Sequence, residues 1–216
     1  GFNSGTITSC YYNSDKFTGN AVNNVGGNAT DVEGKTTTQF ANGDVCSLLN
    51  KALKDENASV RFYQGVSYPE LIMNVPSLDG EVYQISNKEE LYAFALFVNN
   101  VDASANAVLT ADITVNTNLL ALIDEDGNIK DGKTVETWTP IGNNNIPYTG
   151  TFDGQGHTIS GLYFKDSNTD NVGLFGCNKG TIKNVGVVDS YFKGLDYVGG
   201  VCGYNDGGTI TGSYNS

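Results

Sequence analysis

Residues 171–184 read Asn-Val-Gly-Leu-Phe-Gly-Cys-Asn-Lys-Gly-Thr-Ile-Lys-Asn, and residues 198–212 read Val-Gly-Gly-Val-Cys-Gly-Tyr-Asn-Asp-Gly-Gly-Thr-Ile-Thr-Gly. Asn178 aligns with Asn205 at a step of 27 residues, and Ile182 aligns with Ile210 at a step of 28 after one inserted residue. Self-similarity at a step of this length is typical of repeat architectures. The two stretches therefore predict stacked copies of one small unit.

Two further stretches resemble this unit. Residues 1–8 read Gly-Phe-Asn-Ser-Gly-Thr-Ile-Thr and lead to Tyr-Asn-Ser at 12–14, which the chain repeats at 214–216. A weaker copy at 156–162 reads Gly-His-Thr-Ile-Ser-Gly-Leu. We expect one isoleucine of each copy to point inward and to stack on the next: Ile7, Ile159, Ile182 and Ile210. A single copy cannot bury its own apolar face, so the copies must stack on each other.

Composition favours short strands joined by tight turns. The 216 residues include 27 glycines, and 39% are apolar. Glycine and asparagine tolerate the left-handed backbone that turns require. We therefore predict a mainly β fold, namely a parallel β-solenoid that resembles a β-helix, with two short α-helices near 38–53 and 87–100. Apolar residues at helical spacing around Leu48 locate the first helix, and a cap at either Ser86 or Asn87 locates the second.

The order of these segments predicts two parts separated by a linker near 74–80, which carries Pro76. Residues 1–78 would be the closing part of one array, with its last repeat, a helix and a closing strand. Residues 79–216 would be the first part of a second array, with a strand, a helix and repeats. Each part then lacks its natural stacking neighbour, and open sheet edges invite pairing.

At two stretches the chain resembles the GLUG-motif family, which is named for a Gly-Leu-hydrophobic-Gly signature. The stretches are Gly-Leu-Phe-Gly at 173–176 and Gly-Val-Cys-Gly at 200–203, and the second departs from the signature at Val201 and Cys202. The segment 138–159 is similar to the lead-in that precedes such repeats. The resemblance implies a bacterial secreted or cell-surface protein, in some members beside an immunoglobulin-A-cleaving metallopeptidase. It implies no active site.

Charge and cysteine content exclude several classes of function. The net charge is −12, and Arg61 is the single arginine, so the chain lacks the basic face of a nucleic-acid binder. No apolar run reaches the ~18 residues of a membrane span, so we expect no membrane insertion. Gly1 opens no signal-peptide pattern, which indicates a processed or internal portion of a longer protein. The four cysteines form no CxxC pair and are interpreted as small buried residues: Cys10, Cys46, Cys177 and Cys202.

The sequence assigns no catalytic, cofactor-binding or metal-binding residue. A triad of His157, Asp153 and Ser160 lacks any nucleophile motif, and HExxH is absent. The acidic loop at 124–128 lacks the spacing of an EF-hand, which favours a hairpin turn over a calcium site. Six aromatic residues could pack in the core or bind a carbohydrate or protein, and we favour packing for them: Tyr11, Tyr12, Tyr191, Phe192, Tyr197 and Tyr204.

These observations predict a non-enzymatic structural or adhesive repeat module of an extracellular or cell-surface protein. The expected partners are a host glycan or protein, or a second array end, with residues 1–14 stacking on 203–216 either within one chain or head-to-tail between chains. One alternative is a β-helix enzyme acting on polysaccharide, which needs acids that face each other, whereas Asp153, Asp170 and Asp189 occupy turn-like positions. Another is an accessory module of an immunoglobulin-A peptidase-like protein.

Overall fold

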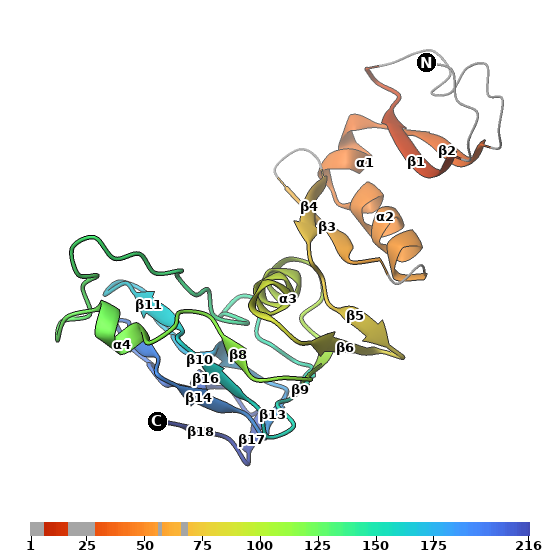
Figure 1. Cartoon of the computed structure of the whole chain (residues 1–216). Helices are drawn as coiled ribbons and strands as arrows, with labels where there is room; N and C mark the ends of the chain where they lie inside the picture. The colour runs from red at the N-terminus through yellow and green to blue at the C-terminus, as the bar shows by residue number, and fades with distance from the viewer. Residues whose placement is uncertain (1–6, 17–28, 56–57, 66–68) are drawn as a thin grey trace. The chain divides into compact units, whose positions relative to one another are not determined.

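The computed structural model of the chain describes residues 7–16, 29–55, 58–65 and 69–216 (Figure 1). The chain divides into two compact units, Gly1–Met73 and Asn74–Ser216. The boundary falls at the start of the stretch for which the sequence predicts a linker. The assignment of the two parts, 1–78 and 79–216, to the ends of two GLUG-type arrays stays a prediction.

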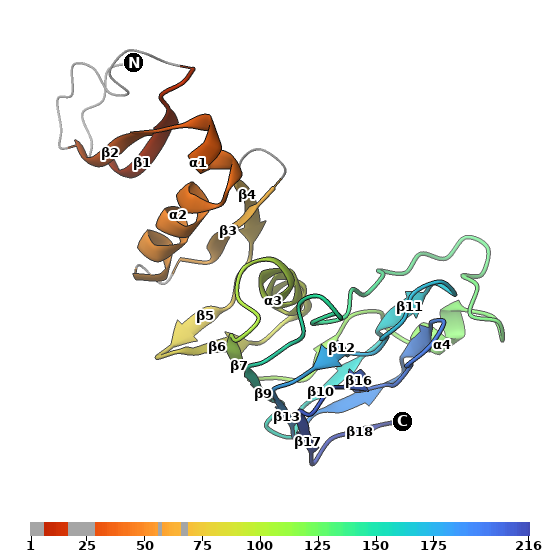
Figure 2. The same cartoon turned by 180° about the vertical axis from the view of Figure 1, so that it is seen from behind.

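The described residues of the first unit form two short sheets and two helices (Figure 2). Strands β1 (Ile7–Asn13) and β2 (Ala29–Lys35) pair in parallel, whereas β3 (Val60–Gln64) and β4 (Pro69–Met73) pair antiparallel. The helices are α1 (Thr37–Ala41) and α2 (Asp44–Asp55). The buried residues that hold this unit together are Phe40, Val45, Cys46, Arg61 and Ile72.

The helix predicted near 38–53 is two helices with a break between them. Thr36 caps α1, since its hydroxyl accepts from the backbone N–H of Gln39 at 3.2 Å. Gly43 then adopts a φ of 92°, which a right-handed helix cannot accommodate, and α2 begins directly after it. The glycine inside the predicted helix is therefore the point at which the chain changes direction.

The second unit is built mainly from parallel strand pairs. Its largest sheet has the order β17-β13-β9-β7-β6-β5, and a four-stranded sheet has the order β18-β14-β10-β8. Two further pairs join β11 to β15 and β12 to β16. The strands are β5 (Ser77–Asp79), β6 (Val82–Ile85), β7 (Asn106–Leu109), β8 (Ile113–Thr114), β9 (Thr151–Asp153), β10 (Thr158–Ser160), β11 (Tyr163–Lys165), β12 (Phe175–Asn178), β13 (Thr181–Lys183), β14 (Gly186–Val188), β15 (Tyr191–Lys193), β16 (Cys202–Asn205), β17 (Thr209–Thr211) and β18 (Tyr214–Asn215).

The mainly β character is confirmed, but the predicted parallel β-solenoid is wrong. The described residues form six separate sheets, four of which have only two strands. Two pairs, β3-β4 and β5-β6, are antiparallel, and the described part of the chain has four helices where two were predicted. Clear copies of the repeat occur only at 171–184 and 198–212, while 86–150 contributes mainly helix and loop. An array needs three or more similar repeats to bury a continuous core.

The predicted stack of four isoleucines is also wrong. Ile182 and Ile210 are direct neighbours in the β13-β17 pair, as their 28-residue step requires. Ile159 lies in a different sheet, between Ile113 and Val187. Phe152 takes the place beside Ile182, and Ile7 of the first unit pairs with Ala29. A short Thr-Ile match therefore does not determine which sheet a strand joins.

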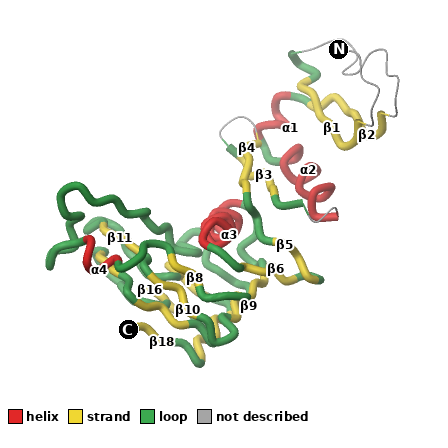
Figure 3. Tube along the Cα trace, in the orientation of Figure 1, coloured by secondary structure: helices red, strands yellow, loops and turns green. Residues whose placement is uncertain are grey.

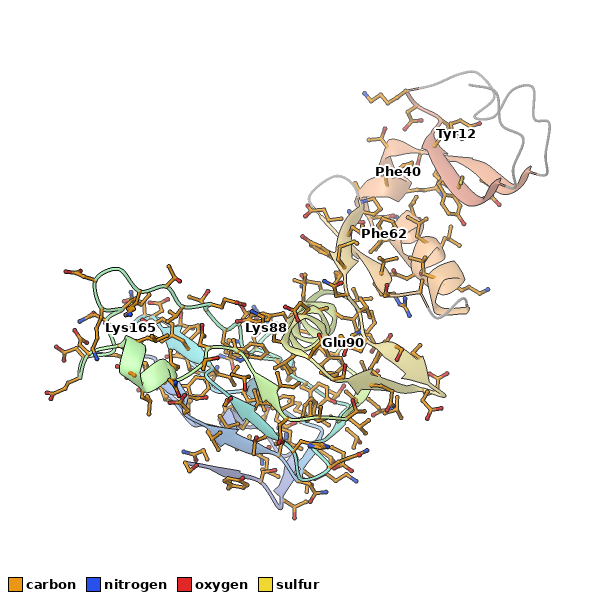
Figure 4. The ribbon with its side chains drawn as sticks, in the orientation of Figure 1. Tyr12, Phe40, Phe62, Lys88, Glu90 and Lys165 are labelled. Atoms are coloured by element: carbon orange, nitrogen blue, oxygen red, sulfur yellow. The ribbon has the colours of Figure 1, made fainter. Side chains whose placement is uncertain are left out.

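The core of the second unit lies under α3 (Lys88–Asn100), the helix predicted over 87–100. Asn87 caps it by accepting from the backbone N–H of Glu90 at 2.9 Å. The Glu90 carboxylate in turn accepts from the backbone N–H of Ser86 at 2.7 Å, and Lys88 forms an ion pair with Glu136 (Figure 4). The buried side chains of this helix are Leu91, Ala93, Phe94, Ala95, Phe97 and Val98.

Aromatic side chains fill the space between α3 and the strands. The ring of Phe94 lies 6.2 Å from that of Phe152, which lies 5.2 Å from that of Phe175. Tyr148 packs 5.1 Å from Phe175, and its hydroxyl donates to the carbonyl of Ala105 at 2.9 Å. All four rings are fully buried. These rings pack α3 and the β-sheets into one hydrophobic core.

A long loop joins α4 (Leu119–Leu122) to β9 (Figure 3). Between these elements the described chain makes isolated bridges and no strand or helix. Trp138 anchors the loop, because its buried indole donates to the carbonyl of Gly173 at 3.1 Å. Residues 130–134 are all exposed.

Candidate functional site

Four strands near the end of the chain lie at the edges of their sheets. They are β15, β16, β17 and β18, and we call them the C-terminal strand set. Each has one strand neighbour among the described residues: β11, β12, β13 and β14, respectively. All four pairings are parallel, so the outer edges of the set carry backbone N–H and C=O groups available to a further parallel strand.

Exposure changes sharply across these pairs. Ile182 is completely buried, whereas its neighbour Ile210 is 37% exposed. Val172 is also completely buried, whereas Val198, its bridge partner, is 45% exposed. The outer copy of the repeat thus presents to solvent the kind of side chain that the inner copy buries.

The exposed apolar residues are numerous in this part of the chain. Those between 195 and 214 are Leu195, Tyr197, Val198, Tyr204, Ile210 and Tyr214. From residue 197 to residue 216 the sequence has one charged side chain, Asp206. Natural sheet edges are usually protected by lysine, proline or a bulge. β16, β17 and β18 contain none of the charged residues or prolines that would prevent another strand from pairing.

A pair of asparagines crosses from the inner to the outer strand. The buried Asn178 amide donates to the Asn205 side-chain oxygen at 2.8 Å and to the carbonyl of Gly180 at 3.3 Å. The Asn178 oxygen accepts from the backbone N–H of Gly180 at 3.1 Å. The exposed Asn205 amide donates to the carbonyl of Gly208 at 2.8 Å. Asn205 therefore repeats the local contact of Asn178 but has one amide hydrogen without a partner among the described residues.

The residues considered for a catalytic triad are not brought together. His157 Nδ1 lies 3.3 Å from a carboxylate oxygen of Asp112, a residue that sequence reasoning did not select. Asp153 instead pairs with Lys183 at 3.1 Å, and the Ser160 hydroxyl contacts that of Thr114 at 3.1 Å. Asp112 also accepts from the backbone N–H of Thr158, and this bond is the main cause of its lowered pKa. The Asp112 carboxylate therefore stabilises the backbone at His157 and Thr158.

The three acids considered for polysaccharide chemistry also accept hydrogen bonds from backbone N–H groups, in turns or at the start of a helix. Asp189 accepts from the backbone N–H groups of Leu119 and Leu120 at the start of α4, at 2.9 and 3.3 Å. Asp170 accepts from the N–H of Asp196 at 3.1 Å, and Asp153 from that of Gln155 at 2.9 Å. The carboxylates thus stabilise separate pieces of backbone.

The acidic loop at 124–128 is a closed turn between the bridge partners Ile123 and Ile129. Asp124 accepts from the backbone N–H groups of Asp126 at 3.0 Å and Asn128 at 2.7 Å. Lys165 donates to the Asn128 side-chain oxygen (Figure 4). Across the described residues, no group of three or more His, Cys, Asp or Glu side chains is placed to hold a metal ion.

This turn makes a pH-dependent contribution to stability that can be measured. Hydrogen bonds from the Asn128 side chain and backbone lower the pKa of Asp124 below 3.8. A lowered pKa stabilises the folded protein above the unfolded pKa, and this contribution is lost as pH falls through the folded pKa. We expect Asp124→Asn to lower the unfolding free energy at pH 6, with the deficit shrinking towards pH 2.5. Urea unfolding followed by Trp138 fluorescence measures this, with Asp131→Asn as the exposed control; a deficit that grows in acid would contradict it.

The cysteines only partly follow their predicted burial. Cys46 and Cys177 are buried and Cys202 is half-buried, but Cys10 is exposed, so the interpretation is wrong there. No described cysteine forms a disulfide. Burial raises the pKa of Cys202 to about 12, which keeps its thiol protonated at neutral pH.

The aromatic residues that the sequence singled out differ in exposure. Tyr11, Tyr12, Tyr191 and Phe192 are half-buried, in keeping with packing. Tyr197 and Tyr204 are 58% and 38% exposed, and their rings lie 5.1 Å apart. These last two belong to the open edge. Sequence reasoning missed that role because nothing in the local pattern distinguishes a covered strand from an uncovered one.

Comparison with known proteins gives one relative. The chain is similar to halomucin of Haloquadratum walsbyi (strain DSM 16790 / HBSQ001), with 30% identity over 191 residues. The match covers 82% of this chain and 2% of halomucin. No family model matches the chain, so its resemblance to the GLUG-motif family stays a prediction. No solved structure matches it. None of the helices in the described part of the chain has the length and apolar character to cross a membrane.

Proposed function

We propose that this chain is a non-enzymatic structural or adhesive module of an extracellular or cell-surface protein, and that it associates through the C-terminal strand set. The observation that carries the proposal is the contrast between Ile182, which is completely buried, and Ile210, which is 37% exposed in the same repeat position. A further strand placed beside β17 would bury Ile210 as β17 buries Ile182. Uncovered strand edges of this kind pair readily with other chains.

Two observations support a location outside the cell. The relative is named halomucin, and that name marks it as a mucin-like protein. The chain is acidic, with a net charge of −12, which keeps a protein with exposed apolar residues soluble. The chain matches 2% of that relative, which is consistent with one module of a much longer protein.

The test is to display the full chain on a non-adherent cell and to measure cell clumping and binding to a glycan array. We expect adhesion above that of undecorated cells, and its loss in the double variant Ile210→Lys, Tyr214→Lys. The matched control is Leu96→Lys, Val101→Lys, which adds the same charge at exposed apolar positions on α3 and directly after it, outside the C-terminal strand set. Adhesion that survives the first variant would refute the proposal. So would release of reducing ends from polysaccharide that Asp153→Asn abolishes.

A further inference from the structure

The C-terminal strand set carries more than an apolar edge, because its asparagine pair specifies what a partner strand must contain. Asn178 donates both amide hydrogens, one to Gly180 two residues on and one across the strands to Asn205. Asn205 donates to Gly208 and keeps one hydrogen exposed. A partner strand that presents an amide oxygen in register would accept this hydrogen and continue the series.

The chain itself contains a segment with this property. Residues 3–7 read Asn-Ser-Gly-Thr-Ile, and residues 178–182 read Asn-Lys-Gly-Thr-Ile, with identical spacing from asparagine to isoleucine. Residues 205–210 have the same order with one glycine more. If Ile7 lay beside Ile210 as Ile210 lies beside Ile182, then Thr6 would face Thr209 and Asn3 would lie in line with Asn205.

The two segments are also compatible in charge. Residues 1–14 contain no charged side chain, and residues 197–216 contain one, Asp206. Asp206 is already paired with Lys179 at 3.1 Å, so it does not repel a neutral strand. β1 is one continuous strand, whereas the chain turns at Gly212, which has a φ of 59°, between β17 and β18, so the pairing is expected at β17. The Tyr-Asn-Ser ending at 12–14 matches that at 214–216, with one extra residue after Thr8.

We infer that the C-terminal strand set of one copy binds residues 1–14 of a second copy in parallel, so that copies join head-to-tail and Asn3 extends the Asn178–Asn205 series. This inference rests on the proposed function and names the partner for it. A head-to-tail contact uses two different surfaces, so it does not stop at a dimer unless the ends meet in a ring. A contact between two C-terminal strand sets would instead stop at two.

Sedimentation velocity on the full chain separates these arrangements. We expect the wild-type chain to form complexes larger than dimers as its concentration rises. Ile210→Lys, which blocks the C-terminal strand set, and Ile7→Lys, which blocks the segment 1–14, should each weaken association at least about tenfold. An equimolar mixture of the two variants should form one-to-one complexes that grow no further, because each variant keeps one intact surface.

A peptide gives an independent measurement. A labelled peptide of residues 1–14 should bind the full chain and reduce its association. The same peptide with Asn3→Ala and Ile7→Lys should do neither. In the full chain, Asn205→Ala should weaken binding of the peptide, and Asn144→Ala, an exposed loop substitution, is its matched control. Circular dichroism and thermal unfolding of every variant establish that the fold is intact.

These experiments distinguish failure of the head-to-tail inference from failure of the proposed function. A monomer at all concentrations, or undiminished association of Ile7→Lys alone, would overturn the head-to-tail inference. In either case, adhesion that Ile210→Lys, Tyr214→Lys abolishes would leave the proposed function standing with another partner. If those lysines change neither adhesion nor association, both proposals fail together.

Discussion

Replacing Phe175 by alanine is expected to lower the unfolding free energy of the second unit by about 3–5 kcal/mol. Phe175 is completely buried, and its ring lies 5.1 Å from Tyr148 and 5.2 Å from Phe152. The substitution removes the shared neighbour of two other core rings and leaves a cavity that the short strands around it cannot readily fill. A loss of this size is a large part of the stability of an ordinary domain.

Urea unfolding followed by tryptophan fluorescence measures this loss in the correct unit. Trp138 is the single tryptophan, it is 1% exposed, and it lies in the second unit. Its signal therefore reports the second unit, because the first unit, whose separate unfolding would complicate a global probe, contains no tryptophan. The control is Leu96→Ala on α3, where the side chain is 41% exposed, and there we expect a change of about 0.5 kcal/mol or less. Equal losses for the two variants would contradict the packing described for this core.

Gly161→Ala adds one methyl group and is expected to lower the unfolding free energy more than most glycine-to-alanine changes in the chain. Gly161 has a φ of 77°, and an added Cβ would meet the backbone oxygen of Asn116 at 2.1 Å. The left-handed backbone alone costs an L-residue about 1–2 kcal/mol. The clash is with backbone, which cannot rotate away, and forcing an extra carbon into a packed site adds about 1–3 kcal/mol.

Gly156→Ala separates these two costs. Gly156 has a similar φ of 85°, but an added Cβ would have no heavy atom within 4 Å. We expect Gly156→Ala to incur only the cost of the left-handed backbone and no steric clash. Gly161→Ala should therefore have a lower unfolding free energy than Gly156→Ala in the same urea experiment. If the two variants had equal stability, the close approach of Gly161 to Asn116 would not exist in solution.

Local features of the fold were predictable from the sequence. Asn87 and the acids after it predict α3, because capping and first-turn charge act within one helical turn. The 27- and 28-residue steps between the two repeat copies also match the observed registers of Asn178 with Asn205 and Ile182 with Ile210. Similar segments that lie next to each other in the chain can pair directly.

Longer-range features were not predictable. Phe152 takes the place beside Ile182 that the sequence pattern gave to Ile159, since which strands meet depends on the helix and loop between them. The candidate site shows the same limit. Ile182 and Ile210 follow the same Gly-Thr, yet one is buried and the other exposed, because only one has a strand on each side. The residues around Ile210 do not show whether a further strand pairs with β17.

The loop anchored by Trp138 has a consequence for how this chain can vary in length. Residues 130–134 are all exposed, and a Cβ added at Gly132 would meet nothing within 4 Å. The chain is held on both sides of this stretch, by the Tyr163 hydroxyl on the carbonyl of Gly127 and by the indole of Trp138 on that of Gly173. Extra sequence spliced between Asp131 and Gly132 would therefore leave both anchors in place. The loop is a natural point at which an epitope tag, a glycosylation sequon or a whole inserted domain could be carried.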